Sequence, residues 1–248
     1  ILEMIPLKET IDDIGGLENL KAWFIKKAKV YKNMNNAKKY GVDMPKGVLI
    51  AGVPGCGKSL NAKAAANLFE VPLLRLDMGR LMGKYVGESE GNLRSAIALA
   101  EAISPCVLWI DELEKAFAGI GGSGGGAEVT TRLFGNGRFD EIFYVGLPNK
   151  EEREKIFNIH IKKRRPQDLK NIRVKELVSI TEGFSGADIE GVVKDAIESA
   201  FAEDKVSIQT ADVIDAIKDT HSLSEIMKEA LEKMTKEYEN RKFKSASK

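Results

Sequence analysis

The residues with the clearest chemical meaning lie between positions 52 and 59, where the sequence reads Gly-Val-Pro-Gly-Cys-Gly-Lys-Ser. This stretch fits the pattern G-x-x-x-x-G-K-[ST], in which backbone N–H groups of a glycine-rich turn surround phosphate groups. An apolar run, Val48 to Ile50, precedes it, and the alanine-rich residues 61–66 behind it have a helical pattern. A phosphate-binding loop needs strand, loop and helix in this order; the alternative is a chance glycine-rich turn.

The residue types in this loop suit different parts of a nucleotide. Lys58 is expected to bind the β- and γ-phosphates, and the hydroxyl of Ser59 is expected to bind magnesium. The N-terminus of the following helix adds positive potential at the phosphates. The sequence therefore predicts that ATP or ADP binds here with Mg²⁺, through Pro54, Gly55, Cys56, Gly57, Lys58, Ser59 and Leu60.

Two carboxylates follow a second apolar run. Residues 106–110 read Cys-Val-Leu-Trp-Ile, and Asp111 and Glu112 come directly after them. The carboxyl ends of buried strands meet at the ligand crevice of an open α/β sheet. Asp111 is therefore predicted to hold the magnesium ion, and Glu112 to act as the general base that polarises the attacking water. The alternative is a solvated strand end before a helix whose first turn favours acidic residues.

The elements that position these residues divide the chain into an α/β part and a helical part. Short apolar runs at residues 47–51, 73–76, 106–110 and 142–145 alternate with helical patterns, which indicates a parallel sheet buried on both faces. After Pro148 the patterns are helical, and Thr210 is the expected N-cap of the helix over 210–219. We predict an N-terminal linker and amphipathic helix (1–40), an α/β core (41–148), a helical domain (149–222), and a C-terminal amphipathic helix with a basic tail (223–248).

Composition narrows the class of protein. The 248 residues include 38 basic and 37 acidic side chains, so the net charge of +1 argues against nucleic acid or a membrane surface as partner. Cys56 and Cys106 have no metal-ligand spacing, which favours a reducing compartment such as the cytoplasm. No signal peptide and no bilayer-spanning run is predicted, and the first residue, Ile1, predicts a fragment of a longer protein.

Four further motifs narrow the class of nucleotide-binding protein to one family. They are Asp13-Ile14-Gly15-Gly16-Leu17, Lys84-Tyr85-Val86-Gly87, Gly137-Arg138-Phe139-Asp140 and Gly183-Phe184-Ser185-Gly186-Ala187-Asp188. In this order they strongly resemble the AAA family (AAA+ superfamily), in particular the poorly characterised single-module AAA proteins of bacteria and plastids. The resemblance implies an ATPase with the doubly wound parallel sheet of P-loop NTPases, followed by a small all-helical lid domain. For a plastid member the compartment would be the stroma.

The resemblance also implies nucleotide contacts outside the phosphate loop. Ile14 and Gly15 match the backbone that borders the adenine pocket, although an ordinary Gly-Gly turn has the same composition. His160 matches a position near the nucleotide, and a packed or solvated helix histidine is the alternative. Gly186 and Ala187 match the lid segment that touches the nucleotide.

Two residues connect the resemblance to a homo-oligomeric ring, commonly a hexamer. Arg138 matches the arginine finger that stabilises charge on the phosphoryl group in the neighbouring subunit; the alternative is a surface ion pair with Asp140 or Glu141. Tyr85 matches a pore loop that grips an extended polypeptide, and a core tyrosine at a helix start is the alternative. The glycine-rich residues 119–126 are either a second pore loop or a flexible linker.

One part of the family pattern is missing. The family has a helix and a strand between the positions of Gly135 and Arg138, and that strand lies between the phosphate-loop strand and the strand of Asp111. A parallel crossover needs about a dozen residues. We therefore expect that a disordered stretch after Gly135 is absent from this sequence; the alternative is a real deletion, in which Gly135 and Asn136 are joined directly. We name no sensor residue.

Three functions fit the predicted chemistry. The first is an ATP-driven remodeller whose pore tyrosines pull on a protein partner. The second is a nucleotide-gated assembly or regulatory scaffold that threads no substrate. The third, a P-loop kinase or nucleic-acid motor, is disfavoured by the near-zero net charge and by the setting of Arg138.

Overall fold

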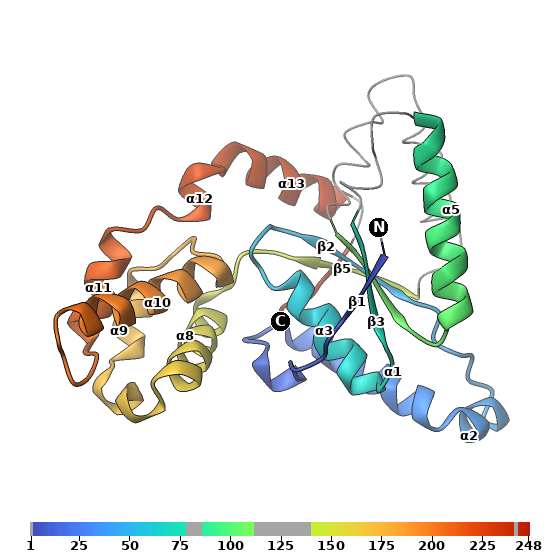
Figure 1. Cartoon of the computed structure of the whole chain (residues 1–248), viewed down its shortest axis with the longest axis horizontal. Helices are drawn as coiled ribbons and strands as arrows, with labels where there is room; N and C mark the ends of the chain where they lie inside the picture. Colours follow the sequence, from blue (N-terminus) through green and yellow to red (C-terminus); the bar gives the residue numbers. More distant parts are fainter. Residues whose placement is uncertain (1, 78–85, 112–139, 241–242) are drawn as a thin grey trace. The chain divides into compact units, whose positions relative to one another are not determined.

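The computed structural model describes residues 2–77, 86–111, 140–240 and 243–248 (Figure 1). The chain forms two compact units, and each is described by itself. Unit 1 comprises Ile1–Ile11, Phe24–Leu49 and Ser59–Glu141, and unit 2 comprises Asp12–Trp23, Ile50–Lys58 and Ile142–Lys248. This division follows packing and not chain order, so the domain boundaries drawn from the sequence stay a prediction.

The sheet of unit 1 has the strand order β1-β3-β4. Strand β3 (Leu73–Asp77) pairs in parallel with β4 (Val107–Asp111), with Leu73 opposite Val107 and Asp77 opposite Asp111. The parallel pairing predicted from the apolar runs is confirmed here. Strand β1 (Leu2–Ile5) pairs with β3 in the antiparallel direction and was not predicted. Only its two end residues are partly buried, so its four residues lack the apolar alternation of a half-buried strand.

Helix α3 (Lys58–Phe69) packs on this sheet through its small side chains. Ala62 and Ala66 form a buried cluster with Leu73, and Ile5, Leu7, Val107 and Trp109 pack around it. Alanine at these positions lets the helix lie close to the strands while keeping high helix propensity. The other described helices of this part are α1 (Glu18–Lys32), which runs through the boundary between the units, α2 (Met34–Lys39) and α5 (Val86–Ile103).

A second sheet has the order β2-β5-β6. It contains β2 (Val48–Gly52), β5 (Glu141–Val145) and β6 (Lys244–Ser245), and β6 runs parallel to β5. Ala246 is buried behind β6, and its carbonyl accepts the N–H groups of Asn19 and Leu20 in the first turn of α1. The sequence predicts only a basic tail here. Two residues are too short a strand to leave a periodic signal.

Helices form the rest of unit 2 (Figure 1). They are η1 (Ile11–Asp13), which starts in unit 1, α8 (Lys150–Arg164), η3 (Pro166–Asn171), α9 (Val174–Ser179), α10 (Gly186–Ala202), α11 (Thr210–Lys218), α12 (Leu223–Ile226) and α13 (Lys228–Asn240). One apolar core joins α8 to α11, and its fully buried members include Phe157, Leu177, Val192 and Val213. The helical character predicted after Pro148 is confirmed, whereas the amphipathic pattern from Leu223 onward is divided between α12 and α13.

The predicted N-cap of α11 is wrong. The helix begins after Gln209, whose backbone N–H donates to the carboxylate of Asp212 in a capping box. Thr210 is already helical, and its hydroxyl binds elsewhere, because it accepts the Arg173 N–H at 2.9 Å and contacts the carbonyl of Asn171 at 3.3 Å. A threonine at the start of a helix is a sequence signal for an N-cap. Here, however, the Thr210 hydroxyl bonds to residues distant in sequence and does not cap the helix.

Candidate functional site

The phosphate loop starts from a close contact between β2 and β5. Gly52 has φ 148°, and a Cβ at this position would overlap the carbonyl group of Val145. The N–H of Val53 donates to the same carbonyl oxygen at 2.9 Å. Only a glycine fits this approach, so the first glycine of the pattern fixes the point where the loop leaves the sheet.

The loop then folds back on itself. Gly55 and Gly57 have φ of 71° and 82°, in the left-handed region that favours glycine. The ammonium group of Lys58 donates to the carbonyl oxygens of Gly52 at 2.7 Å and Val53 at 3.1 Å. The positive charge of Lys58 therefore lies beside a glycine-lined turn and at the start of helix α3. This arrangement suits phosphate groups.

The N-terminus of helix α10 lies on this loop. The Ala187 N–H donates to the carbonyl of Gly55 at 3.0 Å, and a Cβ on Gly186 would lie 3.3 Å from the same oxygen. A reciprocal capping box holds this helix start: Ser185 Oγ accepts the Asp188 N–H, and Asp188 accepts the Ser185 N–H. Gly186 and Ala187 thus lie against the phosphate loop, and the contact with a nucleotide that the resemblance implies for them stays a prediction.

Cys56 is the cysteine of the phosphate loop. Its side chain is buried, and burial raises the pKa of its thiol to about 11, against a smaller lowering by a hydrogen bond from Gly186 and by the charge of Lys58. The thiol is therefore neutral at physiological pH and has the character of a small apolar side chain. Its contribution is to the packing of the loop and not to nucleophilic chemistry.

Helix α8 brings the segment of Ile14 and Gly15 to the same place. Ile14 is buried, and a Cβ on Gly15 would be 2.5 Å from Cγ1 of Ile156. The Cδ1 atom of Ile156 lies 3.9 Å from the Cβ position of Gly186. Ile156 therefore lies between the Ile14–Gly15 turn and the start of α10, so two sequence motifs meet at one side chain.

His160 follows Ile156 by one helical turn and lies on the same face of α8. Its Nδ1 atom is buried and has no hydrogen-bond partner among the described residues. Burial lowers the pKa of the imidazole, and the charge of Glu190 opposes this in part. The ring is therefore neutral near pH 7, which suits a position beside an uncharged base better than one beside phosphates.

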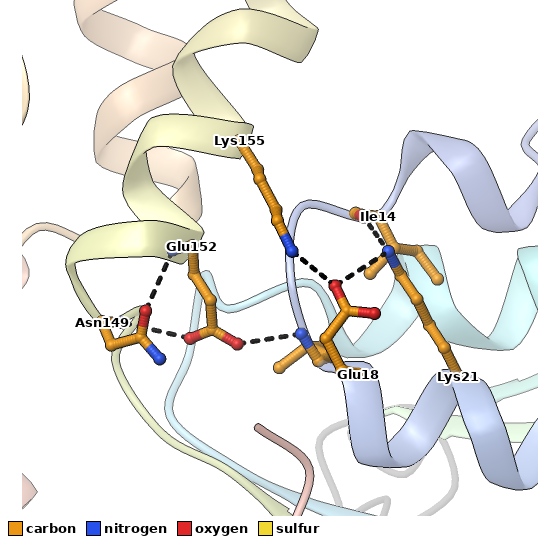
Figure 2. Close-up of polar contacts among 7 residues, drawn as sticks. Ile14, Glu18, Lys21, Asn149, Glu152 and Lys155 are labelled. Atoms are coloured by element: carbon orange, nitrogen blue, oxygen red, sulfur yellow. Dashed lines mark hydrogen bonds and ion pairs between the residues drawn. The ribbon is translucent and has the colours of Figure 1, made fainter. Parts of the chain in front are cut away.

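A polar network joins the start of α8 to the start of α1 (Figure 2). The carboxylate of Glu152 accepts the Leu17 N–H at 2.9 Å and the Asn149 N–H at 3.0 Å. Beside it, Lys155 pairs with Glu18 at 2.6 Å. Sequence reasoning missed Glu152. The Asn-x-x-Glu spacing from Asn149 signals a capping box, but nothing in the sequence signals a bond to a residue 135 positions away.

The remaining predicted site residues are placed only in part. Ser59 and Leu60 lie in the first turn of α3, directly after Lys58, and Asp111 is the last residue of β4 in unit 1. Tyr85, Glu112 and Arg138 lie outside the described residues. Asp140, one of the alternative partners of Arg138, accepts hydrogen bonds from Lys27 and from the Lys46 N–H.

The magnesium ligands stay a prediction. Among the described residues, no group of three or more histidine, cysteine, aspartate or glutamate side chains has the geometry of a metal site. The hydroxyl of Ser59 is the type of oxygen ligand that Mg²⁺ accepts, and Mg²⁺ commonly takes few protein ligands beside nucleotide phosphates and water. Ser59 therefore fits the ion. Within the described helices, none has the length and apolar character needed to cross a bilayer.

Two family models match the chain. Residues 48–136 match the "ATPase family associated with various cellular activities (AAA)", and residues 171–215 match the "AAA+ lid domain". The chain is 39% identical over 265 residues to the uncharacterized AAA domain-containing protein ycf46 of Pyropia yezoensis, with 94% of this chain and 53% of that protein covered. The ycf46 protein of Guillardia theta is also 39% identical, over 249 residues, with 88% of this chain and 48% of that protein covered.

A more distant relative is the cell division cycle protein 48 homolog of Archaeoglobus fulgidus. It is 31% identical over 225 residues, with 75% of this chain and 30% of that protein covered. The chain thus spans about half the length of the ycf46 proteins it matches.

The lengths of these matches bear on the missing stretch. The match to the Pyropia protein has 265 positions, whereas 94% of 248 residues is about 233, so about 32 positions have no counterpart in this chain. The match to the Guillardia protein has 249 positions against about 218 residues, which leaves about 31. The match to the AAA model ends at residue 136, directly after Gly135. About thirty positions is the length that a helix and a strand would occupy.

Proposed function

Because this chain belongs to the AAA family, with an AAA domain followed by an AAA+ lid, we propose that it binds ATP with Mg²⁺ and hydrolyses it to ADP and phosphate. The observation that supports this most directly is the hydrogen bond from the Ala187 N–H to the Gly55 carbonyl. It joins the lid helix α10 to the phosphate loop, so one unit contains both the phosphate-binding turn and the segments that would border the base.

In this proposal each end of the nucleotide has its own set of residues. Lys58 and the N–H groups of the loop bind the phosphates, because they supply a positive charge and donors at a helix N-terminus. Ile14, Gly15, Gly186 and Ala187 border the adenosine end. His160, whose lowered pKa keeps it neutral, is proposed to lie near the base.

Hydrolysis needs groups beyond those that bind. We propose that Glu112 takes a proton from a water molecule, whose oxygen attacks the γ-phosphorus while the bond from phosphorus to the bridging oxygen of ADP breaks. Ser59 and Asp111 are proposed to hold the magnesium ion, which neutralises charge on the phosphate oxygens. Arg138 is proposed to complete this site from a neighbouring subunit of a homo-oligomeric, hexameric ring.

The experiment that tests nucleotide binding is calorimetric titration with ADP and ATP. Lys58→Ala is expected to lose binding by at least about a hundredfold, because it removes the lysine charge that the phosphate loop supplies to the phosphates. Lys162→Ala is the matched control, since Lys162 is exposed at the far end of α8. Equal affinity in the two variants would refute the role of Lys58.

Hydrolysis and assembly need a second pair of measurements. Glu112→Gln is expected to keep ATP binding, to hydrolyse very little and to accumulate assemblies. Turnover at the parental rate in this variant would exclude Glu112 as the base. If Arg138 acts across a subunit boundary, specific activity rises with protein concentration. A flat activity profile, together with monomers on a sizing column, would count against the ring.

We further propose that the ring remodels or unfolds a protein partner, which Tyr85 contacts in the pore. An aromatic side chain packs against many different side chains and so reads little sequence. The alternative is a nucleotide-gated assembly or regulatory scaffold. Tyr85→Ala separates the two, because a remodeller keeps its ATPase activity and loses its work on the substrate, whereas a scaffold is unaffected. The cytoplasmic or stromal location stays a prediction.

A further inference from the structure

Glu152 is a buried carboxylate that the nucleotide proposal does not use. Its side chain is 4% exposed. Oε1 accepts the Leu17 N–H at 2.9 Å and Oε2 accepts the Asn149 N–H at 3.0 Å, while Asn149 Oδ1 accepts the N–H of Glu152 itself (Figure 2). Leu17 directly precedes helix α1, and Glu152 lies in the first turn of α8. The negative charge is thus stabilised by backbone donors at two helix N-termini.

The turn that Glu152 holds has an unusual backbone. Gly16 has φ 93°, and Leu17 has φ 55°, a left-handed conformation that is costly for a side chain such as leucine. A Cβ on Gly16 would overlap the side chain of Glu152. The turn therefore keeps this conformation because neighbouring groups fix it, and Glu152 both packs on it and accepts its N–H.

This contact sets the position of the turn along α8. Glu152 and Ile156 are one helical turn apart on the same face, and Ile156 packs on Gly15. Fixing Leu17 on Glu152 therefore fixes Gly15 on Ile156. A second contact between the two elements, Lys155 with Glu18, joins side chains that are 49% and 40% exposed, and exposed ion pairs contribute little.

We propose that Glu152 is a positioning residue for the base-binding turn. Through the Leu17 N–H it fixes Ile14 and Gly15 against α8, and so sets affinity for the adenosine end of the nucleotide without contacting it. The proposal rests on the nucleotide-binding function proposed above. It concerns the base end alone, because the phosphate loop is anchored separately on Val145 and on the start of α10.

The test compares Glu152→Gln with Glu151→Gln. Glutamine keeps the volume of Glu152 and one acceptor oxygen, but its NH₂ group then faces one of the two N–H donors. Glu151 is exposed in the same helical turn and loses the same charge. Each variant and the parent protein are titrated by calorimetry with ADP and, separately, with inorganic tripolyphosphate, which can occupy only the phosphate loop.

Positioning predicts a selective effect. In Glu152→Gln the affinity for ADP is expected to fall at least about tenfold, while that for tripolyphosphate stays within about twofold of the parent, and Glu151→Gln changes neither. Equal ADP affinity in Glu152→Gln and the parent would overturn the proposal. So would a parallel loss of ADP and tripolyphosphate binding, because Glu152 would then support the whole unit and not the base-binding turn.

A second variant approaches the same contact from the other side. Gly16→Ala places a methyl group against Glu152 and should reproduce the selective loss of ADP affinity. Retained ADP affinity in this variant would also overturn the proposal. If the parent protein binds neither ADP nor tripolyphosphate, the nucleotide-binding function fails and the positioning role fails with it; if the parent binds both and the variants match it, the positioning role alone fails.

Discussion

Asp188 links the fold of the lid to the phosphate loop, and replacing it with alanine should weaken both. Its Oδ2 atom accepts the Ser185 N–H at 2.8 Å, which closes the capping box of α10, and the Leu223 N–H at 3.1 Å, which holds the start of α12. Losing a cap costs about 0.5–2 kcal/mol. A hydrogen bond to a charged acceptor contributes about 1.5–3 kcal/mol, less where water replaces it. We expect Asp188→Ala to lose about 2–3 kcal/mol in free energy of unfolding.

Asp188→Ala should also lower the affinity for the nucleotide. The first turn of α10 carries Gly186 and Ala187, and the Ala187 N–H donates to Gly55. If this turn loosens, the neutral hydrogen bond from Ala187 to Gly55 weakens. Such a bond contributes about 0.5–1.5 kcal/mol, so the affinity for ADP should fall about two- to tenfold.

Urea unfolding followed by circular dichroism measures the stability, and titration with ADP measures the affinity. Asp195→Ala is the control, because Asp195 is exposed in the middle of the same helix and its replacement should change the free energy of unfolding by less than about 0.5 kcal/mol. Equal stability of the two variants would refute the capping role. A loss of stability with unchanged ADP affinity would refute the link between the lid and the loop.

Two further predictions concern titrating groups. Cys56, whose pKa is about 11 because of burial, should resist alkylation at pH 8 in the folded protein and react after unfolding in urea; rapid modification of the native protein would contradict its buried position. His160 has a lowered pKa in the folded state, so below about pH 6.5 the unfolded state binds the proton more readily and stability falls as the pH falls. His160→Gln should reduce the loss of stability between pH 7 and pH 5, measured by urea unfolding, and an unchanged loss would show that other groups cause it.

Features with local signals could be predicted from the sequence. These features are the phosphate loop, the apolar strands around it and the helices after Pro148. Each is signalled by residues within its own element. The strands β1 and β6 could not be predicted, because four and two residues carry no periodicity and their pairing is decided by the strands they join. A local capping rule predicts Thr210 as the N-cap of α11, a role that Gln209 and Asp212 have instead.

The candidate site shows the same limit more sharply. Family motifs indicated Gly15 and Gly186 individually, but no motif indicated that the side chain of Ile156 lies between them. Glu152 bonds to Leu17 across 135 positions. Such contacts depend on where two helices meet, and no residue pattern along the chain encodes that meeting point.

The contacts described in unit 2 account for the binding of a nucleotide better than for its hydrolysis. The phosphate loop with Lys58, the Ile14–Gly15 turn and the start of α10 are held by contacts within that unit. Asp111, by contrast, ends a strand of the β1-β3-β4 sheet, whereas the phosphate loop follows a strand of the β2-β5-β6 sheet.

In the family pattern one more strand stands between those two strands, and about thirty positions of the relatives have no counterpart in this chain. That strand carries the polar residue that orients the attacking water. Binding and hydrolysis should therefore be separable in this protein: affinity for ADP depends on contacts within unit 2, whereas turnover depends also on Asp111, which ends β4 in unit 1.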